Sequence, residues 1–173
     1  MEGVRGIKFR KYFLTLKESR DVIDRSLAEI PGMERVFQRR KVSLQVLEVP
    51  FKKSTAKIYY LEGDPVLVGL PDTKLIPFLT AVEKFNLPLP KVIVDLGAVK
   101  PIASGADVMG PGVKEVEGSF NEGDLVAVVD EKFKAVIAIG VALRPSGEAR
   151  ERGKTIKNIH HAGDSLWKAV SLK

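Results

Sequence analysis

The most informative segment of the chain is Val94-Asp95-Leu96-Gly97-Ala98-Val99, followed four residues later by Ser104-Gly105-Ala106-Asp107-Val108-Met109-Gly110-Pro111-Gly112. It holds four glycines within sixteen residues. Glycine is favoured where φ must be positive or where another backbone must approach closely. A nucleic-acid strand is one such neighbour, because free amides at a helix N-terminus bind phosphate well. The alternative is that these glycines only turn corners in a small barrel, which is the simpler interpretation of their spacing alone.

The sequence around this segment predicts a mostly β second half. Its apolar runs are continuous, as in strands that are buried on both faces. Short strands at regular spacing favour a compact barrel, because closure removes exposed sheet edges. We expect Leu166 and Trp167 to close the core of that barrel. The expected elements are strands over 91–95, 108–109, 125–129, 135–141 and 153–160, and a short helix over 97–103 that contains Pro101.

The first half predicts a small α+β domain. Thr15 and Glu18 have the spacing of a capping box, and Pro31-Gly32 would stop the helix that follows. Three strands are expected over 43–49, 55–61 and 65–69, and then a second amphipathic helix marked by Leu75, Phe78, Leu79, Val82 and Phe85. Two prolines in Asn86-Leu87-Pro88-Leu89-Pro90 favour an extended connector. We therefore expect one domain over residues 1–87 and another over 88–173.

The composition excludes several classes of protein. The 173 residues include no cysteine, so disulfides, thiolate chemistry and cysteine-ligated zinc are excluded. No apolar run approaches the roughly 18 residues of a membrane span. Cationic residues from Arg5 to Lys11 interrupt any signal-peptide core, so we expect a cytoplasmic protein. Scarce Asn and Gln beside 29% charged residues are typical of thermophilic proteins.

Positive charge is concentrated near the N-terminus. Residues 1–60 contain 14 Lys and Arg against 7 Asp and Glu, a net charge of +7, whereas residues 61–173 contain 14 against 15, a net charge of −1. An electropositive region of this kind suggests a phosphate-bearing partner. An ordinary solvated surface would also explain it.

The glycine-rich segment and the tail Asn158-Ile159-His160-His161-Ala162-Gly163-Asp164-Ser165-Leu166-Trp167 resemble a PUA domain, an RNA-binding module. Further elements widen the resemblance: Ile30-Pro31-Gly32-Met33-Glu34, Pro77-Phe78-Leu79 and Leu87-Pro88. With these, the chain resembles an archaeal-like member of the malignant-T-cell-amplified-sequence family, in which a small pre-PUA domain precedes a PUA pseudo-barrel. The resemblance implies a non-enzymatic, translation-associated RNA-binding protein without a cofactor. Eukaryotic members bind the small ribosomal subunit with a density-regulated partner, and act in reinitiation and in clearing tRNA after termination.

The resemblance and the basic residues together suggest two RNA-binding surfaces. We expect structured RNA, rRNA or tRNA, to contact the PUA-like half, and a second basic surface or a protein docking face to lie on the first half. The first set comprises Gly97, Ala98, Lys100, Gly105, Ala106, Asp107, Val108, Pro111, Gly112, Arg144, Arg150, Arg152, Lys154 and Lys157. The second set comprises Arg39, Arg40, Lys41, Lys52 and Lys53.

No residues identify a catalytic or metal site. His160 and His161 are the only histidines, and as strand neighbours they would point to opposite faces, which favours a structural or hydrogen-bonding role. The acidic residues beside glycines are explained by turns. Two alternatives remain: a specificity component of an RNA-modification system, such as a pseudouridine synthase or transglycosylase, and a protein-interaction module with incidental charge. About 87 residues before the connector is small for a catalytic domain.

Overall fold

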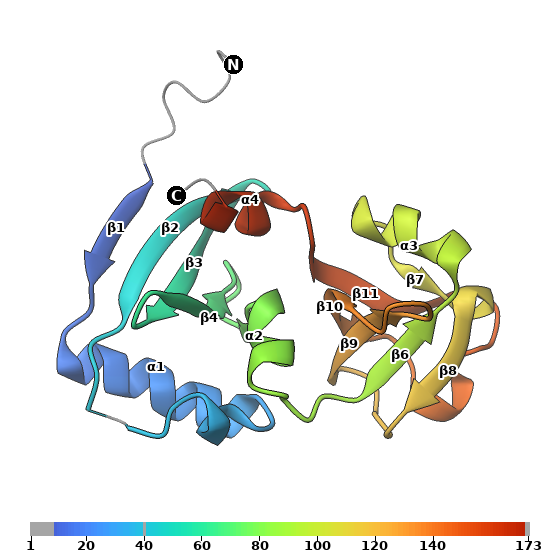
Figure 1. The fold of residues 1–173 in the computed structure, drawn as a ribbon, viewed down its shortest axis with the longest axis horizontal. Helices are drawn as coiled ribbons and strands as arrows, with labels where there is room; N and C mark the ends of the chain where they lie inside the picture. The colour runs from blue at the N-terminus through green and yellow to red at the C-terminus, as the bar shows by residue number, and fades with distance from the viewer. Residues whose placement is uncertain (1–8, 40, 172–173) are drawn as a thin grey trace, which may run out of the picture.

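The structure is a computed structural model that describes residues 9–39 and 41–171. Two sheets lie side by side, and the chain passes from one to the other through residues 86–90 (Figure 1). The first is an antiparallel meander of five strands in chain order. Its strands are β1 (Arg10–Phe13), β2 (Gln45–Phe51), β3 (Ser54–Leu61), β4 (Asp64–Gly69) and β5 (Leu75–Pro77).

Helix α1 (Leu16–Glu29) begins and ends where the sequence predicts. The Glu18 N–H donates to Thr15 Oγ1 at 3.1 Å, and the Thr15 N–H donates to the Glu18 carboxylate at 2.8 Å, so the capping box is confirmed. Gly32, at φ +81°, follows the helix and precedes a short 3-10 turn, η2 (Met33–Arg35). A Cβ at Gly32 would lie 2.2 Å from Pro88 Cδ, so the turn packs against the connector between the sheets.

The second helix is shorter than the sequence pattern predicts. Leu75–Pro77 forms strand β5, which pairs with β4, and only Leu79–Lys84 forms helix α2. The prediction of a helix beginning at Leu75 is therefore wrong. Pro77 explains the difference, because a proline disfavours the helical conformation in the residue before it and fits an edge strand.

The second sheet has six strands in the order β7-β11-β10-β9-β6-β8. All neighbours are antiparallel except β6 and β9. Helix α3 (Leu96–Ala103) follows β6, as predicted, and a 3-10 turn, η4 (Ser146–Glu148), lies between β10 and β11. The strands are β6 (Lys91–Val94), β7 (Val108–Met109), β8 (Val113–Glu117), β9 (Leu125–Asp130), β10 (Val136–Ala142) and β11 (Lys154–His161).

The second sheet curls into a half-barrel because its two edges are tied together. Edge strands β7 and β8 are joined only by the 3-10 turn η3 (Gly110–Gly112), although they lie at opposite ends of the strand order. Gly110 is buried in this turn, and a Cβ there would lie 1.6 Å from the Glu151 carbonyl oxygen. The predicted fold class is confirmed: an α+β N-terminal region followed by a curled, mostly β sheet.

The last helix, α4 (Ser165–Ser171), returns to the first sheet and contacts β2 (Figure 1). Leu166 is fully buried in a cluster that includes residues of both sheets, and the Trp167 ring stacks on Phe78 at 6.5 Å. The prediction that Leu166 and Trp167 close the core of the barrel is therefore wrong. The division of the chain at residues 87 and 88 stays a prediction. No helix in the described part of the chain is long and apolar enough to span a membrane.

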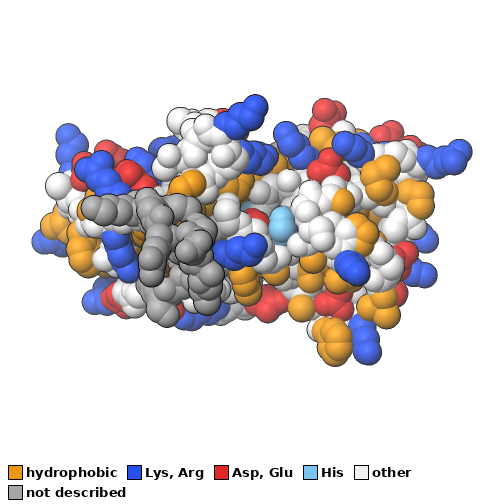
Figure 2. All heavy atoms as spheres, turned by 90° about the horizontal axis from the view of Figure 1, so that it is seen from above, with side chains coloured by type: hydrophobic (Ala, Val, Ile, Leu, Met, Phe, Trp, Pro, Cys, Tyr) orange, Lys and Arg blue, Asp and Glu red, His pale blue; other side chains and the backbone are white. Residues whose placement is uncertain are grey.

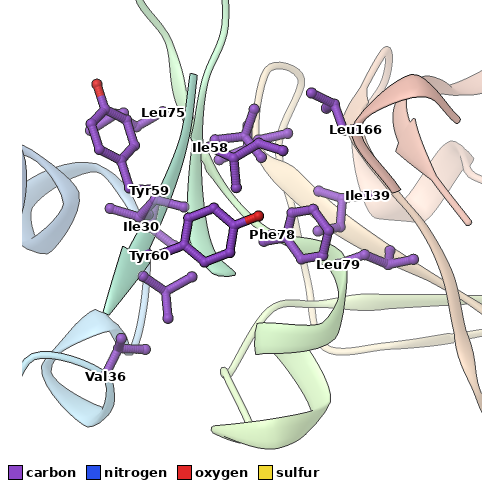
Figure 3. Close-up of a cluster of buried hydrophobic side chains, with 14 of the residues drawn as sticks. Ile30, Val36, Ile58, Tyr59, Tyr60, Leu75, Phe78, Leu79, Ile139 and Leu166 are labelled. Atoms are coloured by element: carbon purple, nitrogen blue, oxygen red, sulfur yellow. The ribbon is translucent and has the colours of Figure 1, made fainter. Parts of the chain in front are cut away.

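His160 on β11 forms a hydrogen bond through each of its ring nitrogens, and the bond at Nε2 links the second sheet to the first half. Its side chain is fully buried. The Leu79 N–H, at the start of α2, donates to Nε2 at 3.2 Å, so Nε2 is unprotonated and Nδ1 donates to the Asp164 carboxylate at 2.7 Å. The ring also lies 5.0 Å from that of Phe78. Figure 3 shows Phe78 among apolar side chains of both halves, including Ile58 and Ile139.

Asp164 anchors the return of the chain toward the first sheet. Besides His160, its carboxylate accepts the N–H of His161 at 2.9 Å and, as the cap of α4, the N–H of Trp167 at 2.8 Å. Burial alone would raise the pKa of Asp164, but these hydrogen bonds lower it below its ordinary value. The ionised carboxylate therefore stabilises the folded state.

Replacing Asp164 with alanine should lower the free energy of unfolding by about 2–3 kcal/mol, because it removes three hydrogen bonds, one from a buried imidazole. Since the folded pKa lies below the unfolded one, the contribution of Asp164 is fully present above the ordinary aspartate pKa of about 4 and is lost as the pH falls through the folded value. Urea titrations at several pH values measure this. Asp124→Ala, which removes one exposed turn hydrogen bond, is the control. Equal losses of stability in the two variants would contradict the role assigned to Asp164.

Gly110→Ala should destabilise the protein by several kcal/mol, because the new methyl carbon must displace the backbone at Glu151. The matched control is Gly147→Ala, where a Cβ would meet nothing within 4 Å and the change should stay within about 0.5 kcal/mol. Thermal unfolding of the two variants measures the difference. Equal stability of both variants would show that η3 does not tie the sheet edges closely.

Candidate nucleic-acid interface

The glycine-rich segment and the basic strand β11 form one surface. β7 pairs with β11, with Met109 opposite Lys154. The loop before β7 is also fixed to β11, because Asn158 Nδ2 donates to the carbonyl oxygens of Ile102 and Ala106 at 2.9 and 3.0 Å. Two features that lie some fifty residues apart in the sequence are thus side by side in the fold.

Asp107 fixes the same loop through a side chain of the loop that bonds to the backbone of β11. Its carboxylate accepts the N–H of Asn158 at 2.9 Å and forms an ion pair with Lys154 Nζ at 3.1 Å. Burial would raise the pKa of Asp107, but the Asn158 hydrogen bond and the charges of Lys154 and Lys157 lower it. Asp107 therefore positions the loop, and its negative charge is compensated by the strand that it contacts.

The predicted residues of the first set differ in exposure. Val108 is buried in the hydrophobic core of the second sheet, so its side chain is not at the surface. Four members are partly exposed: Ala98, Asp107, Gly112 and Arg144. The exposed members are Gly97, Lys100, Gly105, Ala106, Pro111, Arg150, Arg152, Lys154 and Lys157.

Arg144 supports the loop between β10 and β11 and does not present its charge outward. Its guanidinium donates to the carbonyl oxygens of Glu148, Glu151, Arg152 and Lys154 at 2.7–3.2 Å. These bonds use all three guanidinium nitrogens. Arg144 therefore holds the backbone of the basic loop, whereas the side chains of Arg150 and Arg152 are exposed.

The N-terminus of α3 is already occupied by carboxylates. Asp95 accepts the Ala98 N–H at 2.8 Å, and Glu131, from the turn after β9, accepts the Leu96 N–H at 3.1 Å. A phosphate at this end would meet two negative groups. The surface around Gly97 and Ala98 is therefore unfavourable for phosphate, and the favourable region is the loop after α3, which lies beside the cations of β11.

Several exposed cations surround that favourable region. Lys100, Arg150, Arg152 and Lys157 form no ion pair with any residue that the structure describes. Figure 2 shows Lys and Arg side chains standing out from the face seen from above. Sequence reasoning missed Met109, which is 47% exposed beside Lys154 and adds an apolar surface suited to a base or sugar.

The second predicted set does not form one surface. Lys41 precedes β2, whereas Lys52 and Lys53 form the turn after it, about 20 Å away by the length of the strand. Arg39 is paired with Glu62 at 3.1 Å, and Arg40 lies outside the described residues. Lys41 instead borders a hollow with Leu16, Lys17 and Arg20 of α1, two of which are cations that the sequence pattern did not single out.

The described residues contain no cluster of three or more His, Asp or Glu that could hold a metal ion. His160 and His161 do face different neighbours, since His160 is buried against α2 and His161 lies beside Gly105. Both nitrogens of His160 are engaged within the protein, which supports the structural role expected from the sequence.

A PUA-domain family model matches residues 90–162. Translation machinery-associated protein 20 of Saccharomyces cerevisiae is 30% identical over 176 residues, which covers 92% of this chain and 97% of the yeast protein. Human malignant T-cell-amplified sequence 2 is 33% identical over 151 residues, covering 84% and 83%. A crystal structure of a PUA domain from the archaeon Aeropyrum pernix superimposes with a TM-score of 0.81 at 29% identity, covering 95% of this chain and 92% of that one.

These similarities extend over both sheets and are not confined to the matched PUA segment. The chain belongs to the family of PUA-domain proteins that includes translation machinery-associated protein 20 and the malignant T-cell-amplified sequence proteins.

Proposed function

We propose that this protein is a cytoplasmic, non-enzymatic RNA-binding protein of the translation apparatus, and that it holds rRNA of the small ribosomal subunit or tRNA. The observation that carries the proposal is the joining of the glycine-bearing loop 104–112 to the cationic strand β11. Backbone and cations that converge on one exposed surface can bind a phosphate chain without reading its sequence. The names of the relatives support an association with translation.

The RNA surface consists of the exposed residues of segment 104–112, of Lys100 on α3, and of the exposed cations of β11 and of the loop before it. Lys157 and Arg152 are exposed and form no ion pair with a described acidic residue. The cations of α1 and Lys41 form a separate basic area on the first half. That area would suit a second phosphate contact or a translation-factor partner.

Replacing both Arg152 and Lys157 with glutamate should weaken binding to tRNA or to rRNA fragments by roughly tenfold or more, because two phosphate contacts become repulsive. The matched control is Lys132→Glu with Lys134→Glu in the turn after β9, which changes the net charge equally near the carboxylate-capped end of α3. Fluorescence anisotropy measures both. Equal weakening by the two double variants would show that only net charge matters and would contradict the proposed surface.

Binding should also weaken steeply with salt, since cations that neutralise phosphates release counterions. A plot of log affinity against log salt should be linear, and Arg152→Glu with Lys157→Glu should make its slope shallower by about 1 for each phosphate contact that is lost. The same anisotropy titration, repeated at several salt concentrations, provides the slopes. An affinity that does not change with salt would rule out phosphate-dominated binding.

A further inference from the structure

His161 has one ring nitrogen directed at the proposed RNA surface. Its Nδ1 lies 2.9 Å from the Ala162 carbonyl oxygen, which can only accept, so Nδ1 carries the proton. In the neutral ring Nε2 is therefore an acceptor. Among the described residues, no group forms a hydrogen bond with Nε2. The protein thus fixes the orientation of this acceptor without using it.

The space beside Nε2 is open. Gly105 adopts φ +101°, and a methyl carbon built on it would lie 3.4 Å from Nε2. Apart from Gly105 and its two chain neighbours, no other described heavy atom would lie within 4 Å of that carbon. The imidazole is partly exposed. A ligand group can therefore reach Nε2 over Gly105.

A bulge in β11 places His161 on the side of the RNA surface. The pairing with β10 shifts between Ile139, opposite His160, and Gly140, opposite Asn158. As a result, Asn158 and His161 both reach the loop that follows α3, at Ala106 and Gly105 respectively. The acceptor and the cations that approach Asp107 border the same short loop.

The chemistry of this position restricts what it can bind. In the neutral ring, the lone pair on Nε2 repels a phosphate oxygen and requires a donor. In a strand whose phosphates are held by the neighbouring lysines, the donor next to the phosphates is the ribose 2′-hydroxyl, the group by which proteins distinguish RNA from DNA. Resting on the proposed function, we infer that His161 Nε2 accepts a hydrogen bond from a ribose 2′-hydroxyl and gives this surface its preference for RNA.

The test uses the full chain and a hairpin RNA with single-stranded ends, together with derivatives in which one nucleotide at a time is 2′-deoxy. Wild-type protein should bind one derivative roughly three- to tenfold more weakly than the parent, the value of one hydrogen bond. His161→Phe keeps the ring but removes the acceptor, so this sensitivity should disappear. Lys157→Gln, the control, should weaken binding to every RNA and retain the sensitivity.

Each outcome decides between the two proposals. If wild-type protein binds the parent RNA and all derivatives alike, or if His161→Phe keeps the sensitivity, the hydroxyl contact is wrong and the proposed function stands. Sensitivity to base changes alone would assign Nε2 to a base N–H and overturn the inference. If the parent RNA is not bound at all, the proposed function fails. Should His161→Phe not fold, His161→Leu replaces it, because leucine also removes the acceptor.

Discussion

The architecture depends on the hydrogen bonds of one buried imidazole. His160 accepts the first amide of α2 from one half of the molecule and donates to Asp164 in the other. A buried polar group without partners is costly, so the imidazole favours the one arrangement of the halves that satisfies both of its nitrogens. Phe78 packs against this fully buried imidazole, and Trp167 stacks on Phe78. The strand that presents the proposed RNA surface is therefore held rigidly against the first sheet.

This rigidity matters for binding because the proposed surface is assembled from distant segments. Asn158 and Asp107 fix the loop after α3 on β11, and Arg144 fixes the loop that carries Arg150 and Arg152. Because these side chains are already hydrogen-bonded to the backbone, they keep the exposed cations and the Gly105 backbone in place. A pre-organised surface loses less conformational entropy when it binds.

Much of the fold could be predicted from the sequence because its signals are local. The Thr15 capping box, the paired apolar runs of β9 and β10, and the strand–helix–strand order around α3 each depend on neighbouring residues. Strand β5 was not predicted, because the apolar residues around it have helical spacing. In the structure, the effect of Pro77 prevails over that spacing. The packing of α4 against the first sheet could not be predicted, because it depends on the contact of Trp167 with Phe78, which lies nearly ninety residues away in the chain.

The candidate site, too, could be predicted only in part. Glycines and cations could be identified by type, but not which of them face outward: Val108 is buried and Arg144 turns inward. Glu131, which fills the N-terminus of α3, gives no sequence signal because it lies thirty-five residues away. The scattering of the second basic set follows from the length of β2, which separates cations that are close in the sequence.

The return of α4 to the first sheet has a consequence for synthesis of the protein. The N-terminal meander is made before α4, yet its strand β2 packs against residues 165–171 of that helix. During synthesis, the surface of β2 that contacts α4 stays unprotected until α4 has left the ribosomal exit tunnel. The first half therefore completes its folding only after the second half has been made, and chaperones that attend nascent chains would meet it in the interval.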